Sequence, residues 1–270
     1  MPSNKQIAST IDTAIATAMR WASVALFALM LGKMAHAETL TIAAASDLKF
    51  AMAEIIKPFQ ARHPNDRIEV IYGSSGKFFT QIVNGAPFDL FYSADIDYPR
   101  QLQQLGLTIG AAQPYAIGRI VLWSLKPDLA KTPLHELPRA ALRKFAIANP
   151  QHAPYGLRAQ QAMQHEGIWQ TMQPKLVMGE NIAHAAQYID AGAADAGIVA
   201  LALVLSPTLQ GKGAWQLIPA EWHAPLEQGY AITRRASGNP LAKAFAEHMA
   251  SPAARSVMRR YGFALPGEDR

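Results

Sequence analysis

Two loops that carry serine offer hydrogen-bond donors to an anion. Ser46 ends the run Ala-Ala-Ala-Ser, and Ser74 and Ser75 follow a second predicted strand, an alternating segment that ends at Tyr72. Each loop lies between a predicted strand and a predicted helix, where the first helical N–H groups lack partners and carry partial positive charge. Hydroxyls and such N–H groups hold an oxyanion without a buried cation. Helix capping, worth about 1 kcal/mol per helix, is the alternative for each loop.

Both loops are expected at one edge of an open α/β sheet. Ligands of such sheets bind beyond the carboxyl ends of the strands, so Ser46 and Ser75 point to one crevice. The segment Gly73–Lys77 lacks the four-residue spacer of a phosphate loop, and it is one residue short of a nucleophile elbow. Lys77 is expected to be a solvated helix residue.

The other reactive side chains form no complete catalytic or metal-binding pattern. None of the eight histidines has a partner at metal-ligand spacing; His152 is expected in a loop and His184 on a helix surface. Asp89, Asp95 and Asp97 form the only acidic cluster near a strand end, which is compatible with acid–base catalysis or a hard cation. Roles at a strand end and in a turn are the simpler interpretation.

The N-terminal segment is typical of an export signal. Lys5 and Arg20 precede an apolar run of 11 residues, 21–31, and the small-x-small pattern Ala-His-Ala ends at Ala37. The run is shorter than the roughly 20 residues that span a bilayer. We therefore predict a signal peptide over 1–37, cleavage after Ala37 and a periplasmic location, with an uncleaved anchor helix as the alternative.

The composition of the remaining chain excludes several classes of protein. Residues 38–270 carry 22 basic and 19 acidic side chains with no run of lysine or arginine, which argues against nucleic acid as a partner. The chain has no cysteine, so disulfides, thiolate metal sites and a cysteine nucleophile are excluded.

Short apolar runs alternate with helical patterns along this region, which predicts open, mainly parallel sheets with helices on both faces. Strands are predicted over 39–43, 67–72, 88–92, 120–125, 144–148, 196–200 and 230–233. Helices are predicted over 47–62, 78–83, 99–105, 155–166 and 183–191, with one long C-terminal helix from Asn239. Pro58 is expected to kink or end the first helix. Two α/β lobes follow, 38–117 plus 233–270 and 118–232, joined by crossing strands.

In order and spacing, four motifs resemble those of the periplasmic molybdate-binding proteins of ABC transporters, often named ModA. They are Ala43-Ala-Ala-Ser46, Tyr72-Gly-Ser-Ser75, the segment 85–95 and Arg260-Tyr-Gly-Phe263. The resemblance implies the type II periplasmic-binding-protein fold, in which two lobes close on a ligand around hinge strands. It also implies a binding protein rather than an enzyme, and a monomer that needs no cofactor. Such a protein delivers molybdate, and tungstate as well, to the permease subunits of an ABC importer.

The resemblance also implies the residues that hold the oxyanion. These are Ser46 and Ser75 of the first lobe, then Tyr155 and the backbone N–H of Ile182 of the second. Further contacts are expected from two neighbours, Asp47 and Ser74. Molybdenum would be held only through the oxygens of molybdate, with no direct metal ligand. Such a lining offers donors only, and therefore disfavours an anion that carries its own proton.

One position departs from the family. Some members place a tyrosine hydroxyl on the anion directly after a Gly-Ile-Val strand, whereas here Gly197-Ile-Val199 is followed by Ala200. Two other functions remain open at this point. One is a receptor for another small oxyanion, such as sulfate or phosphonate, and the other is a periplasmic hydrolase or transferase, for which no Ser–His–Asp arrangement can be identified.

Overall fold

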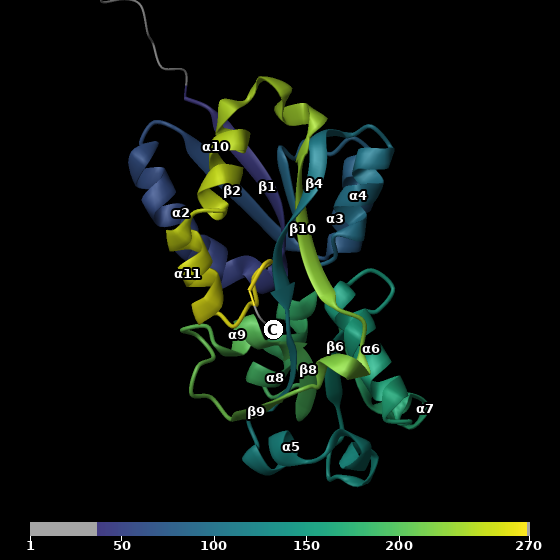
Figure 1. Ribbon diagram of the computed structural model, residues 1–270. Helices are drawn as coiled ribbons and strands as arrows, with labels where there is room; N and C mark the ends of the chain where they lie inside the picture. Colours follow the sequence, from purple (N-terminus) through teal and green to yellow (C-terminus); the bar gives the residue numbers. More distant parts are fainter. Residues whose placement is uncertain (1–36, 269–270) are drawn as a thin grey trace, which may run out of the picture. The chain divides into compact units, whose positions relative to one another are not determined.

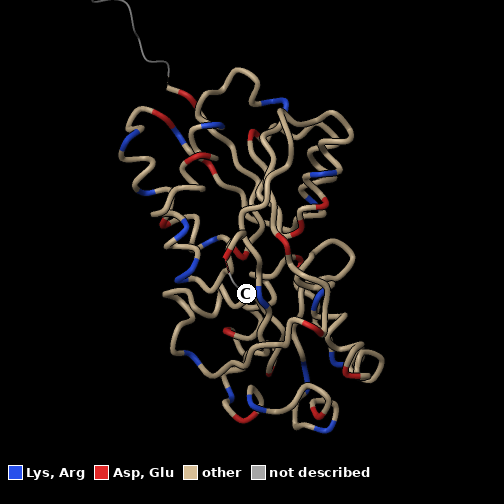
Figure 2. The backbone as a smooth tube through the Cα atoms, viewed as in Figure 1, with Lys and Arg blue, Asp and Glu red and all other residues tan. Residues whose placement is uncertain are grey.

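The computed structural model describes residues 37–268. The predicted signal peptide therefore lies outside the described residues, apart from Ala37. From Glu38 onward the chain forms one compact unit. Within the described part of the chain, no helix is both long enough and apolar enough to cross a membrane. Lysine, arginine, aspartate and glutamate are dispersed over the backbone without a basic stripe (Figure 2).

The first sheet has the strand order β2-β1-β3-β10-β4 (Figure 1). Its strands are β1 (Thr39–Ala45), β2 (Arg67–Gly73), β3 (Leu90–Ser93), β4 (Thr108–Gly118) and β10 (Leu226–Thr233). Strand β1 pairs in parallel with β2 and β3, whereas β10 runs antiparallel to both of its neighbours. One reversed strand in an otherwise parallel sheet confirms the prediction of a mainly parallel arrangement.

The second sheet repeats this plan, with the order β7-β6-β8-β5-β9. Its strands are β5 (Ile120–Ser124), β6 (Phe145–Ala148), β7 (Leu176–Gly179), β8 (Ala196–Ala200) and β9 (Ala214–Leu217). Here β6 pairs in parallel with β7 and β8, and β5 is the reversed strand. The two sheets with their helices confirm the predicted two-lobed fold.

The helices cover both faces of each sheet because the central strands are apolar on both faces. In β1, Leu40 and Ile42 pack with Phe59 and Phe245, whereas Ala43 packs on the opposite face with Phe78. The α-helices are α2 (Lys49–Arg62), α3 (Ser75–Val83), α4 (Asp97–Gln104), α5 (Pro127–Lys131), α6 (Pro154–His165), α7 (Trp169–Met172), α8 (Ile182–Asp190), α9 (Leu201–Val204), α10 (Pro240–Met249) and α11 (Pro252–Arg260). Short 3₁₀ turns are η1 (Ser46–Leu48), η2 (Leu134–Arg139), η3 (Gln173–Lys175), η4 (Ala220–Trp222) and η5 (Arg234–Gly238).

The structure decides two details of the predicted helices. Helix α2 continues to Arg62, as its predicted range has it, so Pro58 does not end it; the side chains of Ile55 and Phe59 are buried on one face and stabilise the helix. The single long C-terminal helix is in fact two helices. Ser251 accepts a hydrogen bond from the N–H of Ala254, and its position before a proline starts a new helix.

The chain crosses between the sheets at two places. Strand β4 leads into β5 through Arg119, whose Nε donates to the carbonyl of Gly262 at 2.8 Å. The return crossing precedes Leu226, because β10 pairs with β3 and β4 of the first sheet. We therefore propose that the second lobe ends before Leu226, and that the first lobe includes all of β10.

Candidate functional site

A small cavity of about 10 Å³ lies between the two sheets, where turns after β1, β2 and β3 meet the first turns of α6 and α8. Its lining residues are Ala45, Ser46, Asp47, Gly73, Ser74, Ser75, Ala94, Ala153, Pro154, Tyr155 and Ile182. All six residues that are predicted from the sequence to contact the oxyanion line this cavity: Ser46, Asp47, Ser74, Ser75, Tyr155 and Ile182. It has room for about one water molecule, so the two lobes are closed on each other in this structure.

Ser46 connects the two lobes directly. It begins η1 after β1, and its Oγ donates to Oδ1 of Asn181 at 3.1 Å. The same Oγ accepts from the N–H of Ala183 at 3.2 Å. Asn181 is the N-cap of α8 and also accepts from the N–H of His184 at 3.1 Å. The hydroxyl of Ser46 in the first lobe thus already binds the N–H of Ala183 in the first turn of α8, next to the N–H of Ile182.

Ser75 has a hydroxyl proton that is free to donate. Its Oγ accepts from the N–H of Ala94 at 3.0 Å, and no acceptor for its proton is found among the described residues. Ser75 is 1 % exposed and is the first residue of α3, so its hydroxyl and the start of the helix face the same small space. This is the arrangement that an oxyanion requires.

Ser74 has a different partner, although it lines the same cavity. Its Oγ donates to the carbonyl oxygen of His152, which also accepts from the N–H of Gly76 at 2.9 Å. Nδ1 of His152 lies 2.9 Å from the same Oγ. No carboxylate among the described residues accepts a hydrogen bond from the ring of His152, so the pair lacks the third member of a catalytic triad. Burial, followed by the charge of Lys77, lowers the pKa of His152.

Tyr155 and Asp47 belong to a buried network that includes Gln228 of β10. The hydroxyl of Tyr155 donates to Oδ2 of Asp47 at 2.9 Å. Nε2 of Gln228 donates to the same Oδ2 at 2.7 Å and to the tyrosine hydroxyl at 3.0 Å. Tyr115 of β4 donates to Oε1 of Gln228 at 2.6 Å. A methyl group at Gly118 would lie 2.3 Å from the Tyr155 hydroxyl, so only glycine leaves room for it.

Asp47 has an unusual environment for a carboxylate. Its Oδ1 is buried without a hydrogen-bond partner in the described structure. Burial raises the pKa of Asp47 to about 6, although hydrogen bonds from Gln228 and Tyr155, and then the backbone N–H groups of Asp47 and Leu48, lower it. Burial and the neighbouring charge of Asp47 raise the pKa of Tyr155 well above its usual value, so this phenol is neutral. The lining therefore includes a carboxylate, which accepts hydrogen bonds when Asp47 is ionised, whereas a donor-only lining requires this group to be neutral.

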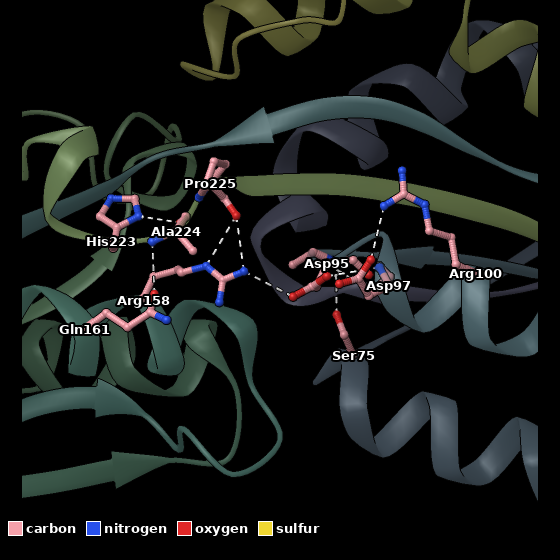
Figure 3. A network of polar contacts seen from close by, with 11 residues as sticks. Ser75, Asp95, Asp97, Arg100, Arg158, Gln161, His223, Ala224 and Pro225 are labelled. Carbon is pink, nitrogen blue, oxygen red and sulfur yellow. Dashed lines mark hydrogen bonds and ion pairs between the residues drawn. The ribbon is translucent and has the colours of Figure 1, made fainter.

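The cations near the cavity form ion pairs across the two lobes. Arg158 of α6 is 7 % exposed; its Nη2 donates to Oδ2 of Asp95, just after β3, at 3.2 Å (Figure 3). The same guanidinium donates to the carbonyl of Pro225. Lys77 of α3 pairs with Glu180, with Nζ and Oε1 2.6 Å apart. These contacts hold the lobes together but leave no lysine or arginine in the cavity lining.

The predicted acidic cluster is used by the backbone and by arginines. The carboxylate of Asp89 accepts from the N–H of Thr41 at 2.8 Å, and Asp97 pairs with Arg100 at 3.1 Å. In the region that the structure describes, no group of three or more histidine, aspartate or glutamate side chains is placed to hold a metal ion. Ala200 is fully buried at the end of β8 and does not line the cavity.

A larger cavity of about 580 Å³ adjoins the small one at Ser46 and reaches His184 and Lys49. Its lining is more apolar than polar, and it lacks Ser75, Tyr155 and Ile182. The smaller cavity has the convergent donors that an anion needs, so we assign the candidate site to it.

Sequence reasoning missed Gln228 and Tyr115 as parts of this site. Neither carries a local signal, since each is a polar residue outside the predicted strands and helices and more than 60 residues from Asp47. Their importance follows only from the pairing of β10 with β4, which brings the two side chains together beneath the cavity.

Comparisons with known proteins agree with this fold. Residues 40–264 match the family described as bacterial extracellular solute-binding protein. The chain is 34% identical to the molybdate-binding protein ModA of Azotobacter vinelandii over 244 residues, which covers 90% of this chain and 96% of that protein. It is 35% identical to ModA of Rhodobacter capsulatus, covering 71% and 75% of the two chains.

Among solved structures, the periplasmic molybdate-binding protein of Azotobacter vinelandii is similar to this chain, with a TM-score of 0.79 and 32% identity. The match covers 84% of this chain and 99% of that one.

Proposed function

Because the chain belongs to the bacterial extracellular solute-binding protein family, we propose that it captures molybdate in the periplasm and delivers it to the permease subunits of an ABC importer. It acts as a monomer, binds tungstate as well, and catalyses no reaction. The relatives that are 34 to 35% identical to it are molybdate-binding proteins, and the same fold surrounds the cavity here.

The observation that carries this proposal is a buried cavity with hydrogen-bond donors and no cation. Ser46 and Ser75 come from one lobe, and Tyr155 and Ile182 from the other. Neutral donors hold a dianion that is fully deprotonated near neutral pH, and a dry site strengthens each charge-assisted hydrogen bond. The starts of α3 and α8 add their unpaired N–H groups.

Capture proceeds by closure of the two lobes. In the open form Ser46 and Ser75 receive the anion, and closure then adds the donors of α6 and α8. The anion replaces Asn181 as the acceptor of the Ser46 hydroxyl proton, because one Oγ proton serves only one acceptor, whereas the N–H of Ala183 can still donate to the same Oγ. Contacts such as Arg158 with Asp95 form only on closure, so they bias the equilibrium toward the closed form.

A second candidate ligand is an oxyanion that carries a proton, such as hydrogen phosphate. The observation that favours it is the unpartnered Oδ1 of Asp47, which is able to accept such a proton when the carboxylate is ionised. The hydrolase alternative has weaker support, because Ser74 donates to a backbone carbonyl rather than to the ring of His152.

Titration calorimetry with molybdate, tungstate, sulfate and phosphate tests the function. We expect molybdate and tungstate to bind with similar affinity, because they have nearly the same size and charge, and sulfate to bind much more weakly. A molybdate concentration of about 100 times the dissociation constant should raise the free energy of unfolding by roughly 2.7 kcal/mol. Tight binding of phosphate or sulfate without binding of molybdate would contradict the proposal.

A further inference from the structure

Asp47 places a carboxylate inside the cavity that is proposed to hold a dianion. Asp47 is 1 % exposed and lines the cavity, and its Oδ1 has no hydrogen-bond partner in the described structure. No lysine or arginine lines the same space, and the nearby cations pair with Asp95 and Glu180. An ionised Asp47 and a bound dianion would therefore repel each other in a site from which water is excluded.

In the hydrogen-bond network around Asp47, no proton remains to be donated to the anion. Tyr155 has a single hydroxyl proton, which it donates to Oδ2 of Asp47. Gln228 donates to both of these groups and supplies no proton to the cavity. As long as Asp47 is ionised, Tyr155 therefore cannot donate to an oxyanion without leaving the carboxylate with one partner fewer.

We propose that Asp47 takes up one proton from solvent when the oxyanion binds, so that the dianion and a proton are captured together. This inference rests on the proposed function. With Oδ2 protonated, Asp47 donates to the Tyr155 oxygen, and the tyrosine donates its own proton to the anion. With Oδ1 protonated, Asp47 donates to the anion directly. In both cases the carboxylate becomes a neutral donor, and the repulsion is removed.

In the described structure, polar and ionisable groups from several elements surround Asp47. The elements packed around η1 present these polar or ionisable groups: Tyr155 on α6, Tyr115 on β4, Gln228 on β10, Tyr72 on β2, and Asn181 and His184 on α8, whereas α9 presents only apolar side chains. Lys49 follows η1 in the chain, but its side chain is exposed beside the ring of Phe50. Burial has already raised the pKa of Asp47 to about 6, and a bound dianion raises it further.

The affinity for molybdate should therefore depend on pH. A group whose pKa is higher in the complex than in the free protein takes up a proton on binding, so binding weakens as the pH rises above the pKa of the free protein. We expect the dissociation constant to increase by up to roughly tenfold per pH unit above about pH 6.5, until the pKa of Asp47 in the complex is passed.

Calorimetry in buffers with different ionisation enthalpies measures the proton directly. At about pH 7.5, the slope of the observed binding enthalpy against the buffer enthalpy should correspond to uptake of nearly one proton by the wild-type protein. Asp47→Asn has the same shape and carries permanent donors, so we expect no uptake and an affinity independent of pH. Asp97→Asn removes an exposed carboxylate of the same lobe, outside the cavity, and should behave as the wild type does.

The possible results separate this inference from the proposed function. Heat from molybdate with no dependence on buffer in the wild type overturns the inference and leaves the function intact. Full proton uptake in Asp47→Asn also overturns it, because another group must then bind the proton. No binding of molybdate overturns both. The wild-type measurement needs no variant, so it decides the question even if Asp47→Asn folds poorly.

Discussion

Replacing Ser46 and Ser75 together by alanine is expected to weaken molybdate binding by roughly 10²–10⁴-fold. Each hydroxyl is proposed to donate one hydrogen bond to a charged oxygen, and such a bond contributes about 1.5–3 kcal/mol. Loss of two gives about 3–6 kcal/mol, and each 1.4 kcal/mol is a factor of about ten in affinity. Calorimetric titration of the double variant measures the effect.

A serine outside the cavity provides the matched control. Ser206 is fully buried, and its Oγ has no hydrogen-bond partner in the described structure, so Ser206→Ala removes a hydroxyl without removing a bond. This variant should bind molybdate as the wild type does. Retention of wild-type affinity by the Ser46 and Ser75 double variant, with its thermal unfolding unchanged, would show that these hydroxyls do not hold the anion.

Gly156→Ala is expected to lower the free energy of unfolding by about 3 kcal/mol or more, the upper end for overpacked sites. A Cβ at Gly156 would lie 2.1 Å from the carbonyl oxygen of Ala148, and this backbone at the end of β6 cannot rotate away as a side chain does. For a chain of this size the melting temperature should fall by roughly 6–12 °C. Thermal unfolding without ligand is the measurement.

The same substitution should also weaken anion binding, because Gly156 adjoins Tyr155 and fixes the first turn of α6 against β6. Gly238→Ala is the control, since a Cβ there meets no atom within 4 Å and its φ is not in the left-handed region. That variant should melt within about 2 °C of the wild type. Equal melting temperatures for the two variants would contradict the packing argument.

Much of the site could be predicted because its chemistry is local. Ser46 follows β1 and starts a 3₁₀ turn, and Ser75 follows β2 and starts a helix; that position alone directs both to one edge of the sheet. The site residues of the second lobe have no such local signal in the sequence. Tyr155 and Ile182 were identified through the resemblance to a family, and Gln228 joins them only through strand pairing.

The fold was predicted better than its irregular parts. Strand β4 was not predicted, because Gly110, Gln113 and Pro114 interrupt its apolar alternation. The break between α10 and α11 did have a readable signal, since Ser251 and Pro252 are a standard helix start. Asp47 was predicted near the anion, but its burial without a cation depends on which side chains close over it, and a linear sequence does not show this.

The position of β10 has a consequence for the biosynthesis of this protein. β10 lies between β3 and β4 in the first sheet, yet all of the second sheet is encoded between Gly118 and Leu226. A chain that emerges from its N-terminus therefore lacks a strand in the middle of its first sheet until Thr233 has been made. Pairings over such long separations form slowly, so the first lobe should stay unfolded for most of the synthesis of the chain. An unfolded segment is the state in which a chain is threaded through a translocation pore.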